Sequence, residues 1–128
     1  MIQGIGIDAV ELDRIQEIIE KKSSFIQRVL TPNELAIFEG LSLKRQVEFL
    51  GGRFACKEAF SKAWHTGIGA VGFQDIEILR DDKGAPIVTK SPFDGEVLVS
   101  ITHTRDTAFA QILLQSRNKE NSKSAREA

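Results

Sequence analysis

Residues 53–64, which read RFACKEAFSKAW, place one carboxylate among the apolar groups of a predicted helix. Successive residues of an α-helix are about 100° apart, so Val47, Phe54 and Glu58 fall on nearly one line. The opposite side is also apolar: it carries Phe49, Cys56, Phe60 and Ala63. Only the arc of Gln46, Arg53 and Lys57 is expected to face water.

An ionised carboxylate on an apolar line is costly unless a cation meets it. Lys62 lies one turn beyond Glu58 and is one candidate partner. A metal ion is the other candidate. The residues alone leave both readings open: a partly buried Glu58–Lys62 pair or a metal ligand.

The N-terminal residues 1–10, MIQGIGIDAV, predict a short strand. Ile5 and Ile7 alternate with Gly4 and Gly6, so one face is bare enough for another backbone to approach closely. Asp8 is expected at the end of this strand, where a carboxylate aimed into a cleft could hold a hard cation. The alternative is that Asp8 is a helix N-cap.

Helical spacing and capping signals continue through the first half of the chain. Thr31-Pro32-Asn33-Glu34 is a capping box with proline at the first helical position. Gly51 and Gly52, inside the longest helix, are expected to admit a neighbouring backbone. The predicted helices span about 10–21, 25–30, 32–40 and 42–65.

The period changes to two after Gly69, which predicts strands. These strands are expected at 73–79, 86–89, 97–102 and 108–114. Helices followed by antiparallel strands indicate an α+β fold, with N-terminal helices and one long central helix packed on a small antiparallel sheet. Residues 1–116 are expected to form a single domain, and residues 117–128, which lack large apolar groups, a disordered charged tail.

Composition limits the function classes. The chain has 128 residues and a net charge of −1, which gives no general attraction to nucleic acid. The first fifteen residues carry several charges, so no signal peptide is expected, and no apolar run suggests a membrane span. The single cysteine suits a reducing compartment. The expected location is therefore the cytoplasm.

Three motifs together resemble a known family. They are GIGIDAVE at 4–11, FACKEAFSKAW at 54–64 and GIG at 67–69. In this order and spacing they are similar to the holo-[acyl-carrier-protein] synthases, the short 4′-phosphopantetheinyl transferases. The resemblance runs from about Ile2 to Leu114. It implies the 4′-phosphopantetheinyl transferase fold and a homotrimer with active sites at the subunit boundaries.

The resemblance also implies a reaction. In this family the 4′-phosphopantetheine of coenzyme A passes to a serine of apo acyl carrier protein for fatty acid biosynthesis, and 3′,5′-ADP leaves. Asp8 and Glu58 match the carboxylates that hold Mg²⁺, which favours few carboxylates together with substrate phosphates. Lys62 would reach a phosphate oxygen, or only pair with Glu58. Either Glu58 or a water on the metal would take the serine proton.

The resemblance implies further residues as coenzyme A contacts, and each of them also has a purely structural interpretation. Gly67 and Gly69 would let a phosphate come close, or simply stop a helix. His103 and Thr104 match a strand end near the nucleotide, where His103 could instead be a structural hydrogen-bonding group. Arg53 would meet the 3′-phosphate, or be solvated.

The acyl carrier proteins of this family are acidic, so a basic docking surface is expected. The candidate residues are Arg14, Lys21, Lys22, Phe25 and Arg28. Because glutamates intersperse them, an ordinary solvated face is the alternative. Two rival functions also stay open: a module that binds carrier protein or coenzyme A without transfer, and a metal-dependent enzyme that acts on nucleotides without a carrier.

Overall fold

The computed structural model describes residues 1–64 and 71–117, and these form an α+β fold as predicted. The helices are α1 (Leu12–Glu20), α2 (Phe25–Val29), α3 (Pro32–Glu39), α4 (Leu43–Ala63) and the short 3₁₀ helix η1 (Phe73–Asp75). The strands are β1 (Ile2–Glu11), β2 (Glu77–Arg80), β3 (Pro86–Lys90), β4 (Glu96–His103) and β5 (Thr107–Gln115). Of the predicted tail at 117–128, residues 118–128 lie outside the described residues.

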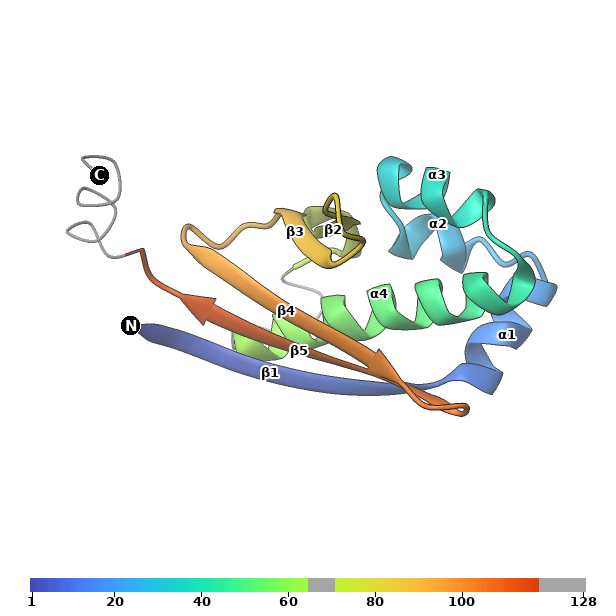
Figure 1. The fold of residues 1–128 in the computed structure, drawn as a ribbon, viewed down its shortest axis with the longest axis horizontal. Coiled ribbons are helices and arrows are strands. Elements are labelled where there is room, and N and C mark those ends of the chain that lie inside the picture. The colour runs from blue at the N-terminus through green and yellow to red at the C-terminus, as the bar shows by residue number, and fades with distance from the viewer. Residues whose placement is uncertain (65–70, 118–128) are drawn as a thin grey trace.

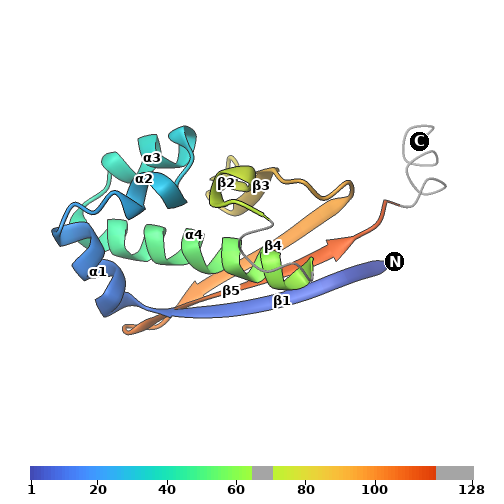
Figure 2. The same cartoon turned by 180° about the vertical axis from the view of Figure 1, so that it is seen from behind.

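Helix α4 is the middle layer of the molecule (Figure 1). On one side it lies along a three-stranded antiparallel sheet with the order β1-β5-β4. On the other side it is covered by α2, α3 and the separate β2–β3 hairpin, as the view from behind also shows (Figure 2). This double cover explains why α4 is apolar on two sides.

The glycine face of β1 determines how closely α4 approaches the sheet. A Cβ on Gly6 would collide with the carbonyl oxygen of Ala59, and one on Gly4 with that of Ala63. The predicted close backbone approach is therefore confirmed at these glycines. It is wrong for Gly51 and Gly52, whose nearest neighbours are side chains of other elements.

Gly6→Ala is expected to lower the free energy of unfolding by about 1–3 kcal/mol, because β1 and α4 must separate to admit the new methyl group. Urea denaturation measures this change. Gly40→Ala is the matched control, since the nearest atom to its added Cβ lies at an ordinary 3.6 Å. Equal stability of the two variants would contradict the close packing.

The predicted capping box of α3 is present. The Thr31 hydroxyl accepts from the Glu34 backbone, and the Glu34 carboxylate accepts from the Thr31 backbone. One arc of α4 was expected to face water, but α2, α3 and β2 cover it. Arg53 is only 7% exposed and Lys57 is fully buried. Periodicity along one helix cannot reveal such a second layer.

Two boundaries also differ from the prediction. Residues 73–75 form η1 rather than a strand, because the Asp75 carboxylate accepts a 2.8 Å hydrogen bond from the Gly72 backbone and closes a turn. Strand β1 runs past Asp8 to Glu11, so Asp8 lies within the strand and is not a helix N-cap.

No helix of the described residues has the length and apolar character that a bilayer crossing needs.

Glu77 gives the fold a pH-dependent contribution. Its burial raises the carboxyl pKa, but hydrogen bonds from Thr31, Thr89 and Asn33 outweigh that and hold the pKa below the ordinary value of 4.5. Because the pKa of Glu77 is lower in the folded state than in the unfolded state, its ionisation stabilises the fold at pH values above the unfolded-state pKa. This stabilisation is lost as the pH falls through the folded-state pKa.

Glu77→Gln is therefore expected to be less stable than the parent chain at pH 7, with the difference shrinking as the pH falls below about 4.5. Thermal unfolding at a series of pH values measures the gap between the two proteins. A gap that stays constant down to the acid limit would contradict the assigned role of the Glu77 carboxylate.

Candidate functional site

The carboxylate of Asp8 and the ammonium of Lys62 meet at the edge of the sheet. Side chains alternate along a strand, so Asp8 points to the same face as Gly4 and Gly6, toward α4. There Lys62 Nζ lies 2.9 Å from Asp8 Oδ1 and also donates to the Ile7 carbonyl at 3.1 Å. The glycine face thus brings α4 close enough for Asp8 to reach its side chains.

Glu58 belongs to the same cluster. Its burial raises the carboxyl pKa, the nearby negative charge of Asp8 raises it further, and Lys62 works in the opposite direction. The predicted Glu58–Lys62 ion pair is replaced by the pair between Lys62 and Asp8. Glu58 therefore shares its surroundings with a second carboxylate, an arrangement that favours a bound cation.

This cluster fits a magnesium ion. Mg²⁺ keeps several waters and commonly takes only one or two carboxylates in addition to substrate phosphates. Asp8 and Glu58 supply two, and the negative charge of Asp8, after burial, helps to raise the pKa of Glu58, so the two carboxylates act on each other. Within 1–64 and 71–117 no three His, Cys, Asp or Glu side chains gather into a metal site. An all-protein cage of the kind that Zn²⁺ uses is therefore a poor description of the described part.

A cationic cavity lies on the other side of α4, against β2, β3 and the end of β4. It has a volume of about 410 Å³ and is lined by Arg45, Arg53, Arg80 and His103, among others. Arg53 is held firmly: Nε donates to the Ile78 carbonyl at 3.1 Å, and the guanidinium lies 4.1 Å from the centre of the Phe49 ring. Three guanidinium groups around one cavity suit phosphate oxygens.

Sequence reasoning found Arg53 and His103 but missed Arg45 and Arg80. Arg45 lies eight residues before Arg53 in α4, so the two are about 80° apart around the helix, and this spacing could have indicated it. Arg80 comes from β2, and only the tertiary fold brings it to the cavity.

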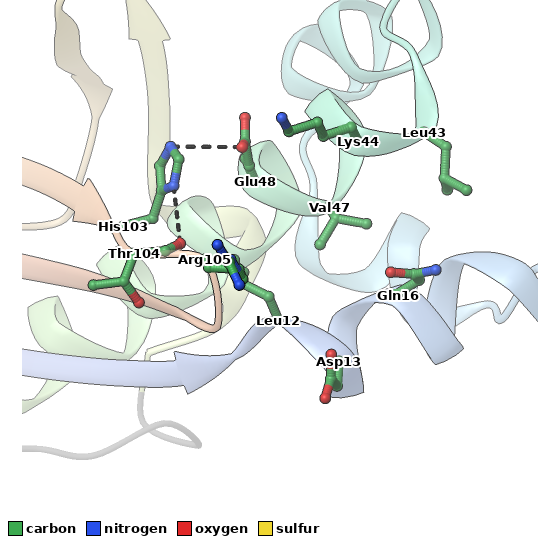
Figure 3. Close-up of a pocket in the computed structure, with 10 residues that line it drawn as sticks. All are labelled: Leu12, Asp13, Gln16, Leu43, Lys44, Val47, Glu48, His103, Thr104 and Arg105. Carbon is green, nitrogen blue, oxygen red and sulfur yellow. Dashed lines mark hydrogen bonds and ion pairs between the residues drawn. The ribbon is translucent and has the colours of Figure 1, made fainter.

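A second cavity, of about 610 Å³, adjoins the first and shares His103 and Glu48 with it. Figure 3 shows His103, Thr104 and Arg105 entering from the β4–β5 hairpin opposite Lys44 and Glu48. His103 Nε2 lies 3.7 Å from a Glu48 oxygen. His103 thus lines both cavities, whereas Thr104 lines only the second.

The expected docking residues surround a groove between α1 and α2. Arg14, Lys21 and Arg28 contribute cations, while Phe25 and Phe54 contribute aromatic rings 5.6 Å apart. Lys22 is exposed next to the groove but does not line it. Because Phe54 precedes Glu58 by one helical turn, the groove adjoins the carboxylate cluster.

The carboxylate cluster and the cationic cavity face away from each other. Glu58 and Arg53 differ by about 140° around α4, and their partners come from β1 and β2 respectively. One chain therefore presents the carboxylate cluster and the cationic cavity on different sides of α4. Gly67 and Gly69, also expected at the site, lie outside the described residues.

Comparison with known proteins shows the family of this chain. A family model described as the 4′-phosphopantetheinyl transferase superfamily matches residues 4–119. A holo-[acyl-carrier-protein] synthase of Enterococcus faecalis is 71% identical over 116 residues, which are 91% of this chain and 99% of that one.

Solved structures are similar as well. The holo-(acyl-carrier-protein) synthase of Bacillus anthracis in complex with CoA (3′,5′-ADP) has a TM-score of 0.85 and 47% identity, covering 91% of this chain and 99% of that one. The Helicobacter pylori synthase in complex with coenzyme A has a TM-score of 0.76 and 33% identity, covering 87% and 99%. This chain belongs to the holo-[acyl-carrier-protein] synthases of the 4′-phosphopantetheinyl transferase superfamily.

Proposed function

We propose that this enzyme moves the 4′-phosphopantetheine of coenzyme A to a serine of apo acyl carrier protein, depends on Mg²⁺, and serves fatty acid biosynthesis. The serine oxygen forms a bond to the pantetheine-side phosphorus, the pyrophosphate P–O bond breaks, and 3′,5′-ADP departs. The carboxylate cluster of Asp8, Glu58 and Lys62 carries this proposal, together with membership of the family.

Asp8 and Glu58 would hold the Mg²⁺ ion. When bound, such an ion neutralises charge on the pyrophosphate and on the departing phosphate. Glu58 is also the proposed acceptor of the serine proton, because its carboxylate belongs to the cluster with Asp8 and Lys62 where transfer is proposed to occur. Lys62, which is 53% exposed while paired with Asp8, can turn toward a phosphate oxygen.

The cationic cavity is the proposed site for the nucleotide end of coenzyme A. Arg45, Arg53 and Arg80 would meet the phosphates of that end, and the aromatic and apolar wall would meet the adenine. His103 and Thr104 would complete its rim. The solved relatives in complex with coenzyme A and CoA (3′,5′-ADP) support this ligand.

A homotrimer would bring the carboxylate cluster and the cationic cavity together. Because the carboxylate cluster and the cationic cavity face away from each other in one chain, we propose that each active site joins the cluster of one subunit to the cavity of the next. The outer face of the sheet supports such contact: Ile5, Leu113 and Leu98 form one row across it, and Ile5 is 57% and Leu98 52% exposed.

Ile5→Lys is expected to break the trimer and lower transfer by roughly tenfold or more, since a buried unpaired ammonium disfavours assembly. Light scattering measures the assembly state, and product formation measures the activity. Ile87→Lys is the control, because Ile87 is 40% exposed but lies on β3, away from this face.

Complementation checks the shared site directly. Glu58→Gln lacks part of the cluster, and Arg80→Ala lacks part of the cavity. After the two inactive variants are mixed, unfolded and refolded together, some boundaries carry an intact cluster opposite an intact cavity and regain activity. If the mixture stays inactive although mixed trimers form, the shared site is wrong.

The docking groove is the proposed binding surface for the carrier. Its cations, Arg14, Lys21 and Arg28, would pair with acidic side chains, and Phe25 would supply an apolar contact. Its position beside Phe54 places the carrier next to Glu58. Lys22, at the margin, would add long-range attraction.

A cytoplasmic location is part of the proposal. The single cysteine, Cys56, is buried, and burial raises the pKa of its thiol to about 12, so the thiol is unreactive.

The test is the release of 3′,5′-ADP from coenzyme A, followed by chromatography, with and without apo carrier protein and with and without EDTA. Transfer predicts release only when carrier and Mg²⁺ are both present. Release without any carrier would favour the rival nucleotide-directed enzyme. Tight binding of coenzyme A or carrier without any release would favour the rival binding module.

A further inference from the structure

One buried ion pair plays no part in the proposed chemistry. Lys57 Nζ lies 2.6 Å from Glu34 Oε1 and donates to the Val29 carbonyl, also at 2.6 Å. Both side chains are fully buried. Glu34 also accepts from the Thr31 backbone through Oε1 and from the Ile78 backbone through Oε2, each at 2.8 Å. We name Lys57, Glu34 and these contacts the Lys57–Glu34 hub.

The hub joins four elements at one point. Lys57 comes from α4 and Glu34 from α3, while Val29 ends α2 and Ile78 belongs to β2. Every polar atom is satisfied: among the described residues, no buried side-chain nitrogen or oxygen lacks a partner. Such a network has one geometry in which all its bonds form, so it fixes the relative position of the elements that it joins.

Stability alone is a weak reason for such a pair. Removing two charges from water is costly, and well-packed apolar residues of similar volume are often at least as stabilising. What an apolar pair lacks is direction: it cannot hold the Ile78 and Thr31 amides or the Val29 carbonyl at defined points.

Strand β2 is the element whose position matters for coenzyme A. The two backbone polar groups of Ile78 are held from both sides: its N–H by Glu34 and its carbonyl by Arg53. Two residues further, Arg80 lines the cationic cavity. The hub therefore links the backbone of α4 to the wall that carries Arg80, although neither Lys57 nor Glu34 lines the cavity.

We propose that Lys57 and Glu34 are positioning residues for coenzyme A: they hold β2 against α4 where Arg80 and Arg53 face the same phosphate. This rests on the proposed function of the cationic cavity. The hub lies on the side of α4 away from Asp8, so its loss should weaken the binding of coenzyme A more than it slows the chemical step.

The first measurement is the kinetics of Lys57→Met and of the double variant Lys57→Met/Glu34→Met. For both, KM for coenzyme A is expected to rise roughly tenfold while kcat changes less than about threefold, as misplaced binding groups predict. The double variant removes the unpaired buried carboxylate and is expected to recover part of the stability that Lys57→Met loses, but not KM. Glu77→Gln is the control: it is buried nearby and bonded to Thr31 and Thr89, with no bond to α4.

Recovery of KM along with stability in the double variant would overturn the proposal, because the hub would then act only through stability. An equal rise of KM in Glu77→Gln would overturn it as well. If Lys57→Met does not fold, the double variant decides alone.

A second measurement needs no substrate. Amide hydrogen exchange at Ile78 is expected to speed up at least about tenfold in the double variant relative to a distant core amide such as Ile112. Unchanged protection of Ile78 would overturn the positioning role. If the parent enzyme shows no transfer at all, the proposed function fails, whereas the exchange experiment still reports on the hub.

Discussion

Transfer of phosphopantetheine is expected to fall by about 10³-fold or more in Glu58→Gln, because metal-assisted charge neutralisation supplies several kcal/mol and each 1.36 kcal/mol is a factor of ten. The amide keeps the shape of the side chain and removes its charge. The measurement is kcat for 3′,5′-ADP release with saturating coenzyme A and carrier. Glu39→Gln, an exposed glutamate on α3, is the matched control and should keep full activity.

The same variant should be more stable than the parent chain at pH 7. The folded-state pKa of Glu58 is raised above the ordinary 4.5, by burial and by Asp8, so the ionised form is disfavoured in the fold. A carboxyl group whose pKa is raised by folding destabilises the protein at pH values above its folded-state pKa. This destabilisation disappears at pH values below its unfolded-state pKa. The gain in Tm of Glu58→Gln should therefore shrink as the pH falls toward 4.5. An inactive variant that is also less stable at pH 7 would contradict the assigned electrostatics.

The second large effect is expected on stability. Lys57→Met should lower the free energy of unfolding by about 3–5 kcal/mol, because it leaves the Glu34 charge buried without its cation. Burial lowers the pKa of Lys57, and the adjacent Glu34 works in the opposite direction. Urea denaturation of the metal-free protein measures the loss. Lys83→Met, on the exposed β2–β3 turn, is the control and should change stability by less than about 0.5 kcal/mol.

A loss below about 1 kcal/mol in Lys57→Met would show that the pocket around Glu34 admits water or that Glu34 takes up a proton. Either result would contradict a tightly closed ion pair. The double variant Lys57→Met/Glu34→Met separates this cost from the direct effect of the missing bonds, because it contains neither charge.

Local signals in the sequence were sufficient for most helices and strands. The capping box at Thr31–Glu34 predicted the start of α3, and the alternation after residue 96 predicted the β4–β5 hairpin. The glycines at 4 and 6 predicted a close backbone approach, and α4 makes it. The capping box and the alternation depend on neighbours within a few residues, which is why the sequence reveals them. For the glycines, the sequence reveals the bare face of the strand but not the distant α4 residues Ala59 and Ala63 that meet it.

Contacts between distant segments were harder to predict. Lys57 and Arg53 looked exposed on the helix because nothing in residues 42–65 indicates that α3 and β2 cover that arc. A pair between Lys62 and Glu58, four residues away, was one of two readings left open, but Lys62 pairs with Asp8 from the edge strand. In each case the partner lies more than 20 positions away along the chain.

The candidate site shows the same division. Asp8, Glu58 and Lys62 were singled out by the residue pattern and then by the resemblance, in two separate motifs, and the structure brings them together. Arg80 was missed because a lone arginine at a strand end carries no local signal. The separation of the carboxylate cluster from the cationic cavity is visible only in the folded chain.

The most direct test of the account is the intact mass of a purified apo acyl carrier protein after incubation with this enzyme, coenzyme A and Mg²⁺. The account predicts that the carrier gains the mass of one phosphopantetheine group, and that EDTA or Glu58→Gln prevents the gain. An unchanged carrier mass across several apo carriers, with the enzyme folded and coenzyme A bound, would contradict it.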